Sequence, residues 1–157
     1  MKLYHGGEIE LVEDSGLFRG VFASARDEAA RSHGRLHYVD IDDANILTNY
    51  ALNYELEHDA VKAAFLAVCK EEGVDPDSEI AWAAVVEDED VFAMDVCDVL
   101  EAFEPAMIGE ESVGMAGLVA QRMRGQVARR LGYQAVEMHD EHGTSYLVLP
   151  GVEFEKA

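Results

Sequence analysis

Basic residues are scarce in this sequence. It contains 12 Lys and Arg against 32 Asp and Glu, which gives a formal net charge of −20 at pH 7. Proteins that bind nucleic acid or anionic membrane surfaces need clustered Lys and Arg, so the composition argues against both as direct partners. The partner that this charge favours is a basic protein, approached by electrostatic attraction.

The shortage of basic residues is concentrated in one interval. Between Lys70 and Arg122 there is no Lys or Arg, whereas the same interval holds fifteen Asp and Glu. Three more arginines follow soon after, at positions 124, 129 and 130. The charge is therefore segregated along the chain, which predicts one strongly negative face.

Long apolar runs and the common phosphate-binding motifs are also missing. No run approaches the length that spans a membrane, and the N-terminus lacks the apolar core of a signal peptide, so we expect a cytoplasmic protein. The two cysteines, Cys69 and Cys97, lie in apolar helical contexts that predict reduced, buried thiols and show no zinc spacing. Neither GxGxxG after a strand nor GxxxxGK[ST] occurs, which excludes a Rossmann site and a P-loop.

The chain of 157 residues, 49% hydrophobic, suits one domain with a real core. The order of predicted elements is not an alternating β-α-β pattern, so we expect an α+β fold with small, split, mostly antiparallel sheets. Apolar patterning and turn residues predict strands at residues 1–5, 36–41 and 152–155, a hairpin around the polar turn 139–142, and a loop at 42–49. Helices are predicted at residues 25–33, 50–72, 79–86, 91–103 and 112–131, with Leu118, Met123 and Val127 of the last one toward the core.

The predicted hairpin turn carries four titratable side chains in a row: His139, Asp140, Glu141 and His142. A hairpin tip needs polar residues and a glycine, but not two acids flanked by two imidazoles. A solvated turn is the ordinary interpretation. A metal site with His5, as in a metal-dependent hydrolase, is another, although neighbouring side chains on a turn diverge and metal ligands must converge.

A third interpretation combines a carboxylate from this turn with His5 and the pair Phe18 and Phe22. Cleavage of a glycosidic bond passes through an oxocarbenium-like state that a nearby carboxylate stabilises. Aromatic faces can hold a flat pyridinium cation, and a histidine beside Gly6 can reach ribose hydroxyls while the backbone approaches the ligand closely. These groups suit NAD, bound without a Rossmann fold.

Several strings of residues resemble a known family. They are Tyr4-His-Gly-Gly7, Gly16-Leu-Phe-Arg-Gly-Val-Phe22, Ser32-His-Gly-Arg-Leu-His37, Leu47-Thr-Asn-Tyr-Ala-Leu-Asn-Tyr-Glu-Leu-Glu57 and the segment from Arg124 to Gly151. In these strings the chain resembles the small anti-CRISPR ADP-ribosyltransferases that disable a type I-F surveillance complex. More distantly it is similar to the wider ADP-ribosyltransferase superfamily, with its histidine, aromatic and acid site.

The resemblance implies an NAD-dependent mono-ADP-ribosyltransferase that modifies a bacterial protein in the host cytoplasm. It implies a basic target, a DNA-recognising subunit of a type I CRISPR surveillance complex. It also implies a pair of small sheets that open a cleft for NAD. No direct contact with nucleic acid or membrane is expected.

The resemblance also implies the site residues. The catalytic acid falls on Asp140, with Glu141 and Glu137 as competing acids, and no metal takes part. The motif histidine and the nicotinamide-contacting aromatics are part of a cofactor-binding set that comprises His5, Gly6, Phe18, Phe22, Asn53 and Tyr54.

Residues 59–120 depart from the family pattern, because this block is longer and more acidic. We expect it to be an acidic helical insertion within a single domain of residues 1–157, and a natural place to recognise a partner. The charge leaves one function of a different class open. The chain would then be a non-enzymatic acidic decoy that blocks a basic nucleic-acid-binding protein without NAD.

Overall fold

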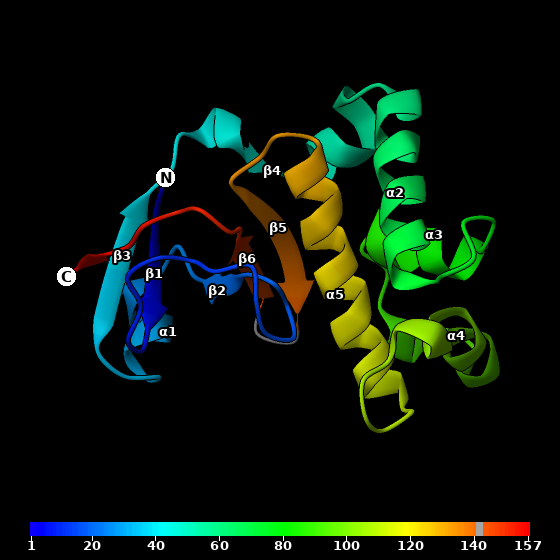
Figure 1. Ribbon diagram of the computed structural model, residues 1–157. Helices are drawn as coiled ribbons and strands as arrows, with labels where there is room; N and C mark the ends of the chain where they lie inside the picture. Colours follow the sequence, from blue (N-terminus) through cyan, green and yellow to red (C-terminus); the bar gives the residue numbers. More distant parts are fainter. Residues whose placement is uncertain (141–142) are drawn as a thin grey trace.

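The computed structural model describes residues 1–140 and 143–157, without the side chain of Asp140. Figure 1 shows the two small sheets on one side and the long helices on the other, with helix α5 (Val113–Arg130) between the second sheet and the remaining long helices. Both termini lie at the first sheet. The predicted α+β class is confirmed, with one antiparallel and one mixed sheet.

The first sheet has three antiparallel strands in the order β1-β3-β7. They are β1 (Lys2–Gly6), β3 (Leu36–Asp40) and β7 (Glu155–Lys156). Helix α1 (Asp27–Arg31) packs on this sheet and is shorter than the predicted helix 25–33. The reason is that the Ser24 hydroxyl accepts a hydrogen bond from the Arg26 amide, two residues on, and does not cap the helix.

The second sheet has the strand order β2-β6-β5-β4. Its strands are β2 (Val21–Ala23), β4 (Ile46–Leu47), β5 (Ala135–Asp140) and β6 (Gly143–Val148). Only the β4–β5 pair is parallel. The predicted loop 42–49 is thus partly wrong, since it contains a 3₁₀ turn, η1 (Asp43–Asn45), and strand β4.

The long helices are α2 (His58–Glu72), α3 (Glu79–Val85), α4 (Val96–Phe103) and α5 (Val113–Arg130), with short turns η3 (Val91–Ala93) and η4 (Glu104–Ala106). Ser78 and Ser112 cap α3 and α5, each accepting from a backbone amide three residues on. The predicted helix 50–72 is instead a π-helix, η2 (Ala51–Glu55), followed by α2, because Leu56 has extended backbone angles. The predicted helix 91–103 is divided by Asp95, which caps α4.

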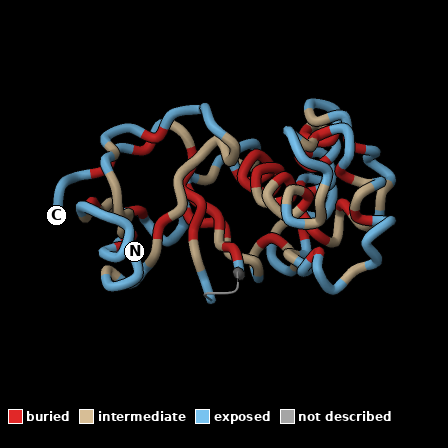
Figure 2. Tube along the Cα trace, turned by 90° about the horizontal axis from the view of Figure 1, so that it is seen from below, coloured by how far each residue is buried: buried red, intermediate tan, exposed pale blue. Residues whose placement is uncertain are grey.

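Helix α5 is the centre of the core. Figure 2 shows buried stretches in the middle of the molecule and exposed ones along its outer helices and loops. A side chain at Gly125 would meet Leu147 of β6 at 2.6 Å, so glycine permits the close approach of α5 to the sheet. Met123 and Val127 are buried as predicted, but Val119 is buried where the pattern predicted Leu118. In the described part of the chain no helix is long and apolar enough to cross a membrane.

The two cysteines differ in burial. Cys69 is buried in α2 and burial raises the pKa of its thiol to about 12, whereas Cys97 is exposed on α4, contrary to the prediction of two buried thiols. Because the thiolate is the reactive form, we expect iodoacetamide to label Cys97 alone in the folded protein and Cys69 only after unfolding. Peptide mass spectrometry at increasing urea concentrations measures this, and equal labelling rates in the native protein would contradict it.

Candidate active site

A cleft of about 800 Å³ lies where the two sheets meet. Its walls come from the ends of β1 and β2, from helix α1 and from the start of β6. Strands β1 and β2 are joined at this place by two backbone hydrogen bonds between Tyr4 and Ser24, of 2.8 and 2.9 Å. This bridge holds the two sheets together at the cleft.

Gly6 lies in the wall of the cleft, where α1 crosses β1. A Cβ atom at this position would come within 1.9 Å of the carbonyl oxygen of Ala30. Only glycine therefore lets α1 lie this close to the strand, and it leaves backbone exposed to a ligand beside His5.

His5 lines the cleft with a fixed ring. Its Nδ1 lies 2.8 Å from the carbonyl oxygen of Phe22, and the ring of Phe154 packs against it at 6.1 Å between centroids. Because a carbonyl only accepts, Nδ1 donates the proton, and Nε2 of the neutral ring is left as an acceptor. The histidine is thus arranged to accept a hydrogen bond from a hydroxyl.

Phe18 and Phe22 form an edge-to-face pair, with ring centroids 4.8 Å apart and planes at 81°. Both are partly buried and pack against the core around α5. Phe22 lines the cleft and Phe18 does not, so Phe18 supports the ring that a ligand can reach.

The cleft also has polar lining residues that the sequence did not single out. Arg26, Ser32 and His33 enter it from the α1 segment, and Thr144 enters from β6. Arg26 is exposed, and its guanidinium has no partner among the described residues. Ser32, His33 and Thr144 belong to strings that carry the family resemblance, whereas Arg26 had only its closeness to Phe22 as a sequence signal.

The hairpin brings Asp140 to the edge of the cleft. Asp140 is the last residue of β5 and pairs with Gly143, which directly precedes the cleft residue Thr144. The side chain of Asp140, like Glu141 and His142, lies outside the described residues. The backbone register alone therefore places Asp140 beside the cleft.

His139 is held from the other side by a loop after α3. The carboxylate of Asp88 accepts from the His139 amide at 2.9 Å and lies 3.2 Å from its Nδ1. Within the described parts of the chain, no group of three His, Cys, Asp or Glu could hold a metal ion. His139 thus joins the α3 loop to the end of β5.

Glu137, one of the competing acids, lies two residues earlier on β5. It faces Tyr146 across the strand pair, and burial together with the Glu137 charge raises the pKa of the Tyr146 hydroxyl. One carboxylate oxygen of Glu137 accepts a hydrogen bond from the backbone amide of Asn49 at 3.3 Å. Glu137 is therefore already engaged within the protein.

Behind the hairpin lies a buried polar network centred on Arg124, which is only 1% exposed. Its guanidinium donates to the carbonyls of Glu137, Val85 and Val86 and to the side-chain oxygen of Asn49, at 2.9 to 3.1 Å. Burial lowers the pKa of this guanidinium, and the nearby Asp88 and Glu137 charges oppose that effect. The network ties α5, α3 and β5 to one another.

The last two residues of the predicted cofactor-binding set, Asn53 and Tyr54, lie in the π-helix η2. The Asn53 amide donates to both oxygens of Asn49 and to the Val86 carbonyl, at 2.9 to 3.0 Å. Tyr54 is 77% exposed and its ring lies 5.2 Å from that of Tyr50. Neither residue lines the cleft described above, and their role in cofactor binding stays a prediction.

Comparisons with known proteins show the family to which this chain belongs. A solved structure titled "Crystal structure of an anti-CRISPR protein" is similar, with 38% identity and a TM-score of 0.63, covering all of this chain and 95% of that one. No curated protein matches. The pattern of the family described as "Anti-CRISPR Type I-F ADP-ribosyltransferase AcrIF11" matches residues 1–156. The chain therefore belongs to the AcrIF11 family of anti-CRISPR ADP-ribosyltransferases, which are enzymes.

Proposed function

We propose that the cleft binds NAD and that the enzyme transfers ADP-ribose from it to a protein side chain. The observation that carries this proposal is the placement of His5, Gly6 and Phe22 on one wall of a cleft that the end of β5 borders. Its volume of about 800 Å³ lies within the usual range of ligand and cofactor sites.

The lining residues match the parts of NAD in turn. The free Nε2 of His5 accepts from a ribose hydroxyl, because Nδ1 is committed to the Phe22 carbonyl. Arg26 is a positive charge that has no side-chain partner among the described residues, and it suits the diphosphate. The face of Phe22, supported by Phe18, suits the nicotinamide ring.

The reaction is a substitution at the ribose carbon that carries nicotinamide. The carbon–nitrogen bond breaks, its electron pair leaves with neutral nicotinamide, and the ribose becomes oxocarbenium-like. The carboxylate of Asp140 stabilises this positive charge. A nucleophilic side chain of the target then attacks the same carbon and loses its proton to solvent.

The target that fits is a basic, DNA-recognising subunit of a type I-F surveillance complex in the host bacterial cytoplasm. The net charge of −20 favours such a surface. The test is intact-mass spectrometry of each subunit after incubation of the complex with this protein, with and without NAD. A mass increase of one ADP-ribose that requires NAD is the expected result. Equal inhibition of DNA binding without NAD and without modification would favour the acidic decoy instead.

Two arginines of the α1 segment form a matched pair for testing the cleft. Arg26 lines it, whereas Arg31 is paired with Asp27 and does not. We expect Arg26→Ala to weaken NAD binding about 10-fold or more, because a charge-assisted contact with the diphosphate is lost. Arg31→Ala should leave binding unchanged. Calorimetric titration with NAD measures both, and equal effects of the two substitutions would contradict this role of Arg26.

A further inference from the structure

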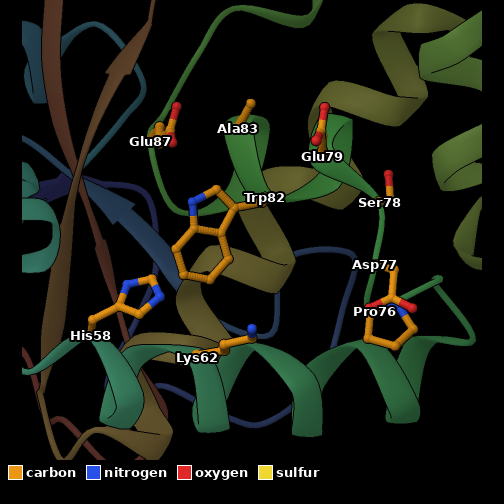
Figure 3. A pocket seen from close by; sticks show the side chains of 9 residues that line it. All are labelled: His58, Lys62, Pro76, Asp77, Ser78, Glu79, Trp82, Ala83 and Glu87. Atoms are coloured by element: carbon orange, nitrogen blue, oxygen red, sulfur yellow. The ribbon is translucent and has the colours of Figure 1, made fainter.

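A second cavity, of about 510 Å³, lies in the helical half of the molecule between α2 and α3. Figure 3 shows Trp82 projecting from α3 toward His58 and Lys62 of α2, with Glu87 and Glu79 on the α3 side and Asp77 at the far end. We call this cavity the Trp82 groove.

The indole of Trp82 is held in place by other rings. It packs edge-on against Phe65 at 5.1 Å between centroids and lies 5.6 Å from the ring of His58. Its burial is nevertheless incomplete, and it lines the cavity. A tryptophan that is held rigidly but open to solvent gives a flat, electron-rich surface for a cation.

The charges around the indole are mainly negative. Asp77, Glu79 and Glu87 line the groove, with Lys62 as its one Lys or Arg, which leaves a net charge of −2 with His58 neutral. In the described part of the chain none of these three carboxylates has a side-chain partner in an ion pair or hydrogen bond. The groove therefore combines an aromatic face with unpaired carboxylates.

The groove is connected to the end of β5 through the residue that follows Glu87. Glu87 of its lining is followed directly by Asp88, whose carboxylate holds the backbone and ring of His139. His139 in turn directly precedes Asp140. A segment bound beside Glu87 thus lies near the end of β5, where an acceptor must be presented.

We propose that the Trp82 groove is a docking site for an arginine-bearing segment of the target protein. Arginine fits better than lysine, because its planar guanidinium stacks on the indole while its edge donates to carboxylates. This inference rests on the proposed function, since it assumes a basic protein target. It assigns to the acidic helices the task of holding that target while the cleft holds NAD.

Binding of a purified type I-F surveillance complex, measured without NAD by biolayer interferometry, tests the groove independently of catalysis. We expect Trp82→Ala and Glu87→Lys each to weaken binding about 10-fold or more. Glu101→Lys on α4 is the control, because it makes the same charge change at an exposed residue outside the groove. Where transfer is measured, the two groove variants should raise KM for the complex and leave kcat and NAD affinity unchanged.

Three results would overturn the proposal. The first is that Glu87→Lys, once circular dichroism has verified that it is folded, binds the complex as tightly as the unaltered protein. This variant decides the question even if Trp82→Ala does not fold. The second is an equal loss in Glu101→Lys, which would show only an effect of overall charge. The third is a dimer of this chain in analytical ultracentrifugation that Glu87→Lys dissociates, which would assign the groove to a second copy. A complex that binds through the groove but gains no ADP-ribose would contradict the proposed function alone.

Discussion

Replacing Asp140 by alanine is expected to slow ADP-ribose transfer on the order of 10²- to 10³-fold at saturating NAD, the size of effect seen when one electrostatic stabiliser is removed. In the proposed reaction its carboxylate opposes the positive charge on the ribose as nicotinamide leaves. Asp140 stands at the end of β5, beside the cleft residue Thr144 on the paired strand. Transfer from labelled NAD to the surveillance complex measures the rate.

The stability of this variant separates catalysis from structure. Asp140 is the last residue of strand β5, so its replacement should change the free energy of unfolding by only a few tenths of a kcal/mol. Asp140→Asn provides a sharper comparison, because it removes the charge and keeps the size. Undiminished transfer by either variant would remove Asp140 from its assigned role.

The two competing acids are compared in the same assay. Glu137→Gln retains an oxygen that can accept from the Asn49 amide, so its effect reports mainly on the lost charge. Glu141→Gln makes the equivalent change at the other competing acid. If Glu137→Gln or Glu141→Gln loses more activity than Asp140→Asn, that residue is the principal catalytic acid.

The largest effect on folding is expected from Arg124→Met. The substitution removes the donors to the buried backbone carbonyls of Val85 and Glu137. The Val86 carbonyl and the Asn49 side-chain oxygen still accept from the side-chain amide of Asn53. Each buried acceptor left without a partner costs about 1–3 kcal/mol, so the loss should be about 2–6 kcal/mol. Urea unfolding followed by circular dichroism measures it.

Arg130→Met is the matched control on the same helix. Arg130 is exposed and paired with Glu71, also exposed, so its removal should cost less than about 1 kcal/mol. Similar midpoints for the two variants would show that the Arg124 network contributes no more than a surface ion pair. A stable Arg124→Met protein with normal transfer would also show that the hairpin does not depend on this network.

Local features were predictable wherever a few neighbouring residues decide the conformation. Ser78 and Ser112 cap their helices because the hydroxyl reaches an amide three residues away. The pairing of β5 with β6 follows from alternation on either side of a polar stretch, although β5 runs to Asp140 and so includes two residues of the predicted turn 139–142. His5 and Phe22, predicted because the chemistry of NAD cleavage calls for such groups, line one cleft, and their roles stay a prediction.

Other features depend on segments that are far apart in the chain. Strand β4 forms because it pairs with β5, nearly ninety residues away in the sequence. The local pattern of residues 42–49 does not predict a strand. The side-chain amide of Asn53 points into the protein because it donates to the carbonyl of Val86. Arg26 lines the cleft because α1 packs on β1. Cys97 has Val96 and Val99 close to it in the sequence, yet its face of α4 is exposed to solvent.

The sequence by itself determined the α+β class and the segregation of negative charge along the chain, because composition, periodicity and capping act over short distances. Only the tertiary structure decided that Arg124 is the buried centre of a network. A guanidinium can be buried only where several acceptors converge, and these come from helix, strand and loop segments that meet only in the folded chain.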